Sequence, residues 1–114
     1  MWVRAPPDAI DNNNETRFSM VDRVRPLFTL GQCVATPGAL AALEEARQTP
    51  ADFLGRHVHG DWGEIHPDDK GANEQALKDD ARIFSVYRTS KGVKVWVITE
   101  ADRASTCILL PDEY

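Results

Sequence analysis

The stretch from residue 82 to residue 114 most constrains what this chain can fold into. Its sequence concentrates β-branched and aromatic residues in an alternating pattern, which predicts short β-strands. Gly92 can take the positive φ that a short hairpin loop needs, and Pro111 ends the pattern. Apolar residues fall on both faces, so we expect one face of the sheet to be covered and the other to be partly covered. The three expected strands are 82–89, 93–99 and 105–110.

The length and charge of the chain limit its function. With 114 residues it can bury one modest core, so we expect a single domain. Its formal net charge of −5 argues against binding nucleic acid by broad neutralisation of phosphates. The acidic charge fits a protein that docks on a basic partner, and it leaves open an enzyme that touches RNA at one small site.

The composition of the first residues predicts a flexible leader over 1–19, followed by one α+β domain over 20–114. Residues 1–19 contain a proline pair and an asparagine run, with little periodicity. Neither a signal peptide nor a membrane span is expected, so the predicted location is cytoplasmic. Cys33 and Cys107 are interpreted as buried free thiols, and no cofactor is expected.

Three helix starts precede the expected sheet. Thr36-Pro37 and Thr49-Pro50 each place a hydroxyl cap before a proline at the first helical position, and His66-Pro67 starts a third helix. A loose apolar alternation over 27–35 predicts a short strand before these helices. The expected fold is therefore α+β: an N-terminal short strand and three helices packed on a C-terminal three- to four-stranded antiparallel meander.

Several strings in residues 28–114 resemble a family of short uncharacterised proteins carried on plasmids and integrative elements, described as plasmid-related protein. The resemblance implies a setting on a mobile genetic element, and it brings no established activity. Residues before Val21 lie outside it, and Cys107 stands where the family would have Thr or Cys. The strings are Leu30-Gly31, Val34-Ala35-Thr36-Pro37-Gly38-Ala39-Leu40, Arg56-His57, Gly60-Asp61-Trp62-Gly63, Thr99-Glu100-Ala101-Asp102-Arg103, Leu109-Leu110-Pro111 and Tyr114.

One set of polar residues could carry catalysis. Helices followed by an antiparallel sheet, with a histidine on a helix and Arg, Ser and Thr on strands, are similar in layout to small ribonuclease toxins of the barnase and RelE type. RNA cleavage needs a base, a cation and an acid, which His57, Arg82 and Arg103 could supply. In the other interpretation His57 is a core histidine, and Arg103 pairs within its own turn. The supporting donors would be Ser85, Tyr87 and Thr99, and Thr106 belongs to the same set of residues.

A second set could form a protein-binding surface. Trp and Arg are favoured anchors in interfaces, so a rim of polar groups around an indole could bind a partner. This requires the Gly60–Gly63 turn to pack near the Glu100–Arg103 turn. In the alternative, Trp62 fills the core and Asp61 caps the next segment. The predicted binding residues are Asp61, Trp62, Glu100, Asp102 and Arg103.

No metal site is expected, because His57 and His59 are two residues apart on a helix and point to different sides. The leading hypothesis is a small cytoplasmic accessory protein of a mobile genetic element that binds a host or defence protein and is not an enzyme. The alternative is a ribonuclease-like toxin with His57 at its active site, the one case in which nucleic acid would be a partner.

Overall fold

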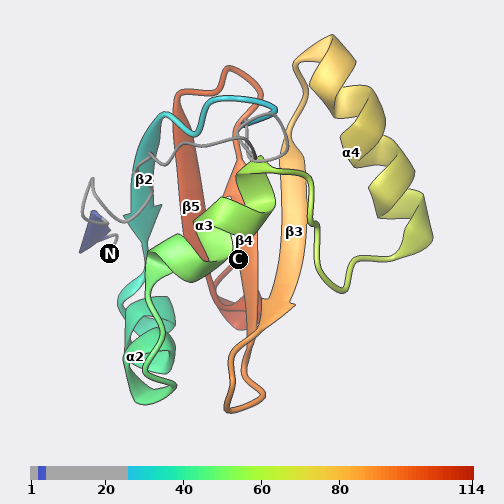
Figure 1. Ribbon diagram of the computed structural model, residues 1–114. Coiled ribbons are helices and arrows are strands. Elements are labelled where there is room, and N and C mark those ends of the chain that lie inside the picture. Colours follow the sequence, from blue (N-terminus) through green and yellow to red (C-terminus); the bar gives the residue numbers. More distant parts are fainter. Residues whose placement is uncertain (1–2, 5–25) are drawn as a thin grey trace, which may run out of the picture.

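The computed structural model of the protein describes residues 3–4 and 26–114. Its centre is a five-stranded sheet with the order β1-β2-β5-β4-β3 (Figure 1). The strands are β1 (Val3–Arg4), β2 (Gln32–Ala35), β3 (Ile83–Arg88), β4 (Lys94–Thr99) and β5 (Ser105–Leu109). The strands β3, β4 and β5 form an antiparallel meander, as their sequence pattern predicts.

The sheet as a whole is mixed, so the expectation of a purely antiparallel sheet is wrong. β2 pairs with β5 in parallel, with Cys33 opposite Thr106 and Ala35 opposite Ile108. Only a hairpin forces two strands to be antiparallel, whereas a long connection leaves their relative direction open. Three helices and two strands separate β2 from β5 in the chain, so no short turn fixes their orientation.

The three helices of the described residues begin where the sequence predicts. α2 (Pro37–Glu45) is capped by Thr36, whose hydroxyl accepts from the amide of Ala39 at 3.0 Å. α3 (Pro50–Val58) follows Thr49, whose amide donates to the Asp52 carboxylate. α4 (Pro67–Asp79) is capped by the His66 ring. The α+β class and these three helices are confirmed.

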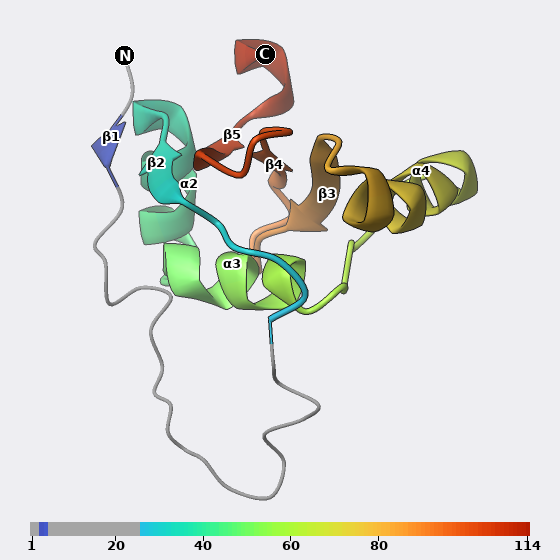
Figure 2. The same cartoon turned by 90° about the horizontal axis from the view of Figure 1, so that it is seen from above.

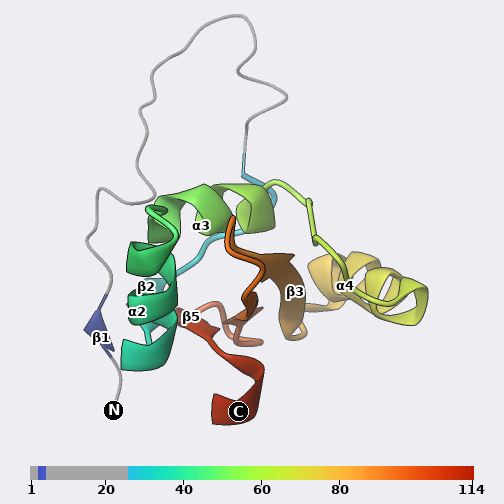
Figure 3. The same cartoon turned by 90° about the horizontal axis from the view of Figure 1, so that it is seen from below.

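The helices lie on one face and at the margins of the sheet. α3 crosses one face, α2 lies at the end of the sheet near β2, and α4 runs beside β3 (Figures 1 and 2). The side chain of His57 on α3 bonds Ser85 and Thr99, so alternate residues of β3 and β4 face this helix. Viewed from below, η3 (Pro111–Glu113) lies on the other side of the sheet (Figure 3).

We call the sheet face turned away from α3 the far face. Strand alternation and register assign to it Phe84, Val86, Trp96, Ile98, Cys107 and Leu109. The face toward α3 contains fully buried residues, and it forms the main core with α2 and α3. The largest members of that core are Leu43, Phe53, Leu54, Tyr87, Val95, Val97 and Ile108.

Two sets of hydrogen bonds, one from the backbone and one from a side chain, occupy the outer edge of β3. The amide and carbonyl of Val86 bond to the carbonyl of Trp62 and the amide of Glu64, so the chain before α4 pairs with the strand. The side chain of Asn73 on α4 bonds both the carbonyl and the amide of Phe84, at 2.6 and 3.0 Å. Asn73 is 2% exposed, which places it inside the contact between α4 and the sheet.

Two residues of the expected leader, Val3 and Arg4, form β1, which pairs antiparallel with β2. The other residues of the predicted leader, 1–2 and 5–19, lie outside the described part of the chain. Among the described residues, no helix combines the length and the apolar character needed to cross a membrane.

Candidate functional site

His57 stands at the centre of a buried hydrogen-bond chain. Its imidazole is 0% exposed, with Nδ1 2.6 Å from the Ser85 hydroxyl and Nε2 2.9 Å from the Thr99 hydroxyl. The Thr99 hydroxyl lies 2.7 Å from that of Thr106, which donates to the carbonyl of Leu30 at 2.8 Å. The structure thus brings together four of the residues named for the ribonuclease interpretation.

The carbonyl of Leu30, which can only accept, sets the donor and acceptor of each bond in this hydrogen-bond chain. Thr106 uses its one hydrogen on Leu30, so it must accept from Thr99, and Thr99 must accept from Nε2 of His57. His57 therefore carries its proton on Nε2, and its Nδ1 accepts from Ser85. Burial, together with the positive charge of Arg103, lowers the pKa of His57 to about 3. The ring is consequently neutral at physiological pH.

The two arginines of the ribonuclease interpretation are placed apart. Arg82 donates to the Tyr114 hydroxyl at 2.8 Å and lies 3.6 Å from Glu100. Tyr114 packs on Trp96 of the far face, so the sheet separates Arg82 from His57. These residues do not line a common cleft.

Arg103 is occupied by backbone carbonyls. Its guanidinium donates to the carbonyls of Ala76 and Ala81 at 3.0 and 2.7 Å, and to those of Glu100 and Ala101 at 3.2 Å each. Ala76 lies in the last turn of α4, and its carbonyl also accepts from the amides of Asp80 and Ala81. Arg103 therefore ties the end of α4 to the turn between β4 and β5, rather than to a site for phosphate.

Trp62, predicted as either a surface anchor or a core residue, is a core residue. Its side chain is 4% exposed, and it packs with Ala76 and Ile83. The indole donates to the Glu74 carboxylate at 3.2 Å. Gly63 follows with φ +73°, and a Cβ there would overlap the carbonyl of Val86. The Asp61-Trp62-Gly63 segment is thus shaped to pair with β3.

The Gly60–Gly63 turn and the Glu100–Arg103 turn are joined through Phe28. Its ring stacks on Trp62 with centroids 6.4 Å apart, and the Arg103 guanidinium lies 5.6 Å from its centre. The edge of His57 meets the same ring at 5.3 Å. The interface interpretation requires these turns to be close, and one aromatic ring connects them. The Trp62 indole, which is the anchor in the interface interpretation, lies beneath that ring.

The remaining predicted binding residues serve local structure. Asp61 accepts two bonds from the exposed Arg56, at 2.7 and 3.3 Å, and the hydrogen bond from Arg56 holds the pKa of that carboxyl below its usual range. Asp102 accepts from the amide of Ala104 within its turn. Glu100 lies beside Arg82. These carboxylates are exposed and do not form one cluster.

Sequence reasoning missed an aromatic cluster on the far face. Phe84 and Trp96 meet edge to face, with centroids 5.1 Å apart, and Tyr114 meets Trp96 at 5.6 Å. Phe84 and Trp96 are only partly buried, and Tyr114 is 69% exposed. The available signal was the strand alternation, which places Phe84 and Trp96 opposite the residues that face α3. Nothing in the pattern placed Tyr114 on them.

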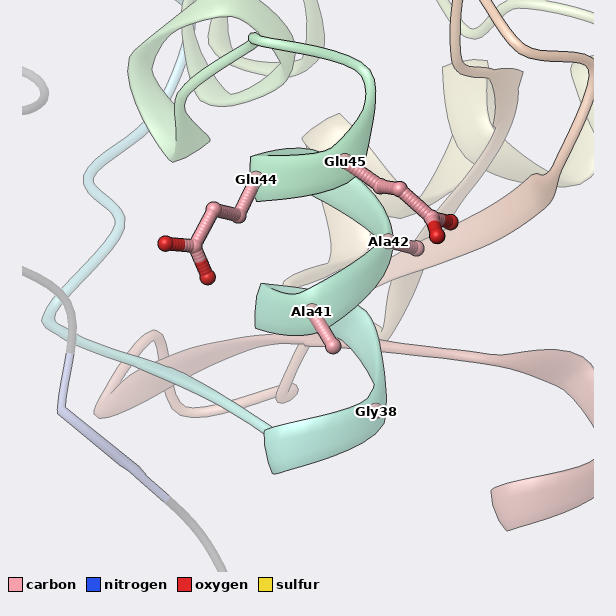
Figure 4. Close-up of a pocket in the computed structure, with 5 residues that line it drawn as sticks. All are labelled: Gly38, Ala41, Ala42, Glu44 and Glu45. Carbon is pink, nitrogen blue, oxygen red and sulfur yellow. The ribbon is translucent and has the colours of Figure 1, made fainter.

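A hollow with a volume of about 480 Å³ lies beside α2. Figure 4 shows that its two carboxylates, those of Glu44 and Glu45, point to opposite sides of the helix, and the other lining residues are Gly38, Ala41 and Ala42. This lining offers a ligand few polar groups that converge on one point. In the described part of the chain, no group of three or more His, Cys, Asp or Glu residues is arranged to bind a metal.

The two cysteines also offer no reactive site. Cys33 is buried and Cys107 is partly buried, and both are free thiols as predicted. Burial and the charges of Glu113 and Glu100 raise the pKa of Cys107 to about 12, so its thiolate is scarce at neutral pH.

Comparisons of the chain with protein-family models, curated proteins and solved structures gave no match.

Proposed function

We propose that this protein acts by binding another protein, and that the partner docks on the far face of the sheet around Trp96. The observation that carries the proposal is the aromatic cluster of Phe84, Trp96 and Tyr114, which stays partly or largely exposed. Aromatic side chains with an arginine beside them are typical of the energetic centre of an interface. Arg82 stands at this cluster, bonded to the Tyr114 hydroxyl.

The chemistry of the polar residues favours binding over catalysis. A general base must reach its substrate, and it works best with a pKa near the working pH. His57 is fully enclosed and has its pKa lowered to about 3, and both of its nitrogens are engaged. The guanidinium of Arg103 is engaged by the carbonyls of Ala76 and Ala81. These features support a structural role for His57 and the hydrogen-bond chain around it.

The setting is proposed from the strings that resemble plasmid-related proteins. An accessory protein of a mobile genetic element that binds a host or defence protein would need a stable small scaffold and one exposed apolar surface. The partly exposed cluster of Phe84, Trp96 and Tyr114 on the far face provides such a surface. It replaces the surface centred on Trp62, because Trp62 is buried.

Site-specific photo-cross-linking in cells that express the protein from its own locus would test this proposal. A photoreactive phenylalanine analogue is placed at Tyr114 on the far face, and at Lys94, an exposed residue of β4 that lies on the same face two positions before Trp96. Matched controls carry it at Lys70 and Gln75, exposed positions of α4. We expect a discrete protein adduct from both far-face positions and none from the controls. The Trp96→Ala variant should lose the adduct while it still melts cooperatively.

Two outcomes would overturn the proposal. One is the absence of an adduct specific to the far face, or an adduct with nucleic acid alone. The other is cleavage of a mixed RNA substrate by the purified wild type that disappears in His57→Ala without a loss of stability.

A further inference from the structure

The position of Tyr114 indicates what kind of side chain the far face accepts. Its ring meets the Trp96 indole at 5.6 Å and 63°, and its hydroxyl accepts a hydrogen bond of 2.8 Å from Arg82. Both contacts are specific for a tyrosine, because one uses the ring and the other uses the hydroxyl. The side chain is nevertheless 69% exposed, so it removes little of its surface from water.

The site that holds this ring consists of Trp96, Phe84 and Arg82, which have contacts of their own apart from Tyr114. Phe84 meets the indole of Trp96 edge to face at 5.1 Å and 88°. Trp96 lies in the middle of β4, opposite Val86 on one side and Leu109 on the other. Arg82 is also 3.6 Å from the Glu100 carboxylate. The ring surface and the donor therefore remain in place when Tyr114 leaves, and a pre-organised site lowers the cost of binding.

The chain just before Tyr114 has its own anchor. The Glu113 carboxylate accepts from the Thr36 hydroxyl at the start of α2 and from the amide of Leu110 at 2.8 Å. These hydrogen bonds hold the pKa of Glu113 below its usual range. The turn Pro111–Glu113 is thereby fixed, whereas the Tyr114 side chain is held by the indole of Trp96 and by Arg82. The Tyr114 side chain can therefore leave its contacts with Trp96 and Arg82 while the turn Pro111–Glu113 stays folded.

From these contacts we infer that the far face holds a tyrosine-binding site, which Tyr114 fills in the free protein and a tyrosine side chain of the partner fills in the complex. The inference rests on the proposed function and specifies the chemistry of its partner. Tyr114 then acts as an intramolecular competitor. A ligand group tethered at short range has an effective concentration on the order of millimolar, so it weakens binding of a free tyrosine-bearing segment without abolishing it.

A peptide titration tests the site with a probe taken from the chain itself. The probe is the pentapeptide Leu-Pro-Asp-Glu-Tyr, which has the sequence of residues 110–114 and is acetylated and amidated so that its ends carry no charge. It is added to the full-length Tyr114→Ala variant, and the NMR signal of the Trp96 indole is followed. That signal is assigned with a Trp96→Phe variant. Control peptides end in phenylalanine or alanine in place of tyrosine.

We expect the Trp96 signal of Tyr114→Ala to shift saturably with the tyrosine peptide. The alanine peptide should bind at least about tenfold more weakly, because it lacks the aromatic contact, worth roughly 1 kcal/mol or more, and the hydrogen bond. The wild type should need at least about twofold more tyrosine peptide than the variant, because its own Tyr114 competes at an effective concentration on the order of millimolar. In Arg82→Met/Tyr114→Ala, the tyrosine and phenylalanine peptides should bind equally.

The inference is overturned by any of three results: no shift at Trp96, equal binding of the tyrosine and alanine peptides, or equal affinity of the wild type and Tyr114→Ala. Thermal melting of Tyr114→Ala should match that of the wild type closely, because the side chain is mostly exposed. Far-face cross-links to a protein, together with a failed peptide titration, would remove the tyrosine site and leave the docking function standing.

Discussion

The Nε2 atom of His57 lies 2.9 Å from the Oγ1 atom of Thr99 and donates its proton to it. Through this bond an imidazole on α3 joins β4, and through Thr106 it reaches β5 and the carbonyl of Leu30 before β2. Ser85 adds β3 on the other side of the ring. A single side chain thus connects four segments that are distant in sequence, and its removal should affect stability more than surface chemistry.

Replacing His57 by alanine should lower the free energy of unfolding by about 1–3 kcal/mol, because Ser85 and Thr99 lose their partner and a cavity forms. Urea unfolding of purified protein measures the change. His59→Ala is the matched control, since His59 is an exposed histidine at the end of the same helix. Its Nδ1 bonds the carbonyl of Gly55 at 2.6 Å, and the loss of this exposed bond should cost under about 1 kcal/mol. Similar losses of stability in both variants would contradict a central role for the buried hydrogen bonds of His57.

Acidification should destabilise the protein before most carboxylates titrate. Unfolded His57 binds a proton as the pH falls through its ordinary pKa of 6.5, whereas folded His57 stays neutral down to about pH 3. The unfolded state therefore binds more protons, and folding stability falls as the pH decreases through this window. Between pH 6.5 and 5 the contribution of this one group is about 1.5–2 kcal/mol.

The pH effect is measured by urea unfolding at several pH values, for the wild type and for His57→Gln. The variant cannot gain the histidine proton, so its stability should change less over the same pH interval. Parallel pH profiles for the two proteins would show that other groups cause the acid sensitivity.

Thr36→Ala should cost more than Thr49→Ala. The Thr36 hydroxyl caps α2 and also donates to Glu113, and it is buried. We expect a loss of about 1–2 kcal/mol for Thr36→Ala and under about 1 kcal/mol for Thr49→Ala, whose side chain is exposed. Thr36→Ser keeps the oxygen and should recover most of the stability. Thermal melts of the three variants decide the order, and an inverted order would contradict the cap assignment.

Two glycine substitutions should act in opposite directions. Gly63 has φ +73° and no space for a Cβ, so Gly63→Ala should destabilise by at least about 2 kcal/mol. Gly71 lies inside α4 with nothing within 4 Å of a built Cβ. Gly71→Ala should therefore stabilise by about 0.5–1 kcal/mol. Differential scanning calorimetry measures both, and a neutral Gly63→Ala would mean that the Trp62 segment does not pair tightly with β3.

Local patterns predicted the helices and the meander because neighbouring residues determine them. Thr36 and Thr49 each precede a proline that a helix tolerates only in its first turn, and the alternation around Val95 and Val97 indicates a strand. The parallel pairing of Cys33 with Thr106 depends on segments far apart in the chain, and no local signal fixes it.

The same distinction applies to the site residues. The apolar helix face of His57 indicated burial, but its partners lie 28 and 42 positions away. Trp62 sits in a polar stretch that resembles a surface turn, and it is buried because this stretch pairs with β3 and is covered by Phe28. The contact of Tyr114 with Trp96 depends on the path of the chain after Pro111, which strand periodicity does not describe.

Asn73 presents to Phe84 one carbonyl oxygen and one amide, the same pair of groups that a neighbouring strand would offer. A foreign β-strand approaching this side of the molecule would find the hydrogen-bonding positions of Phe84 and Val86 already taken. To add itself there, it would first have to pull α4 away from the sheet. At the β3 edge the protein can therefore leave an aromatic surface open for a partner and still resist the edge-to-edge stacking that leads to fibrils.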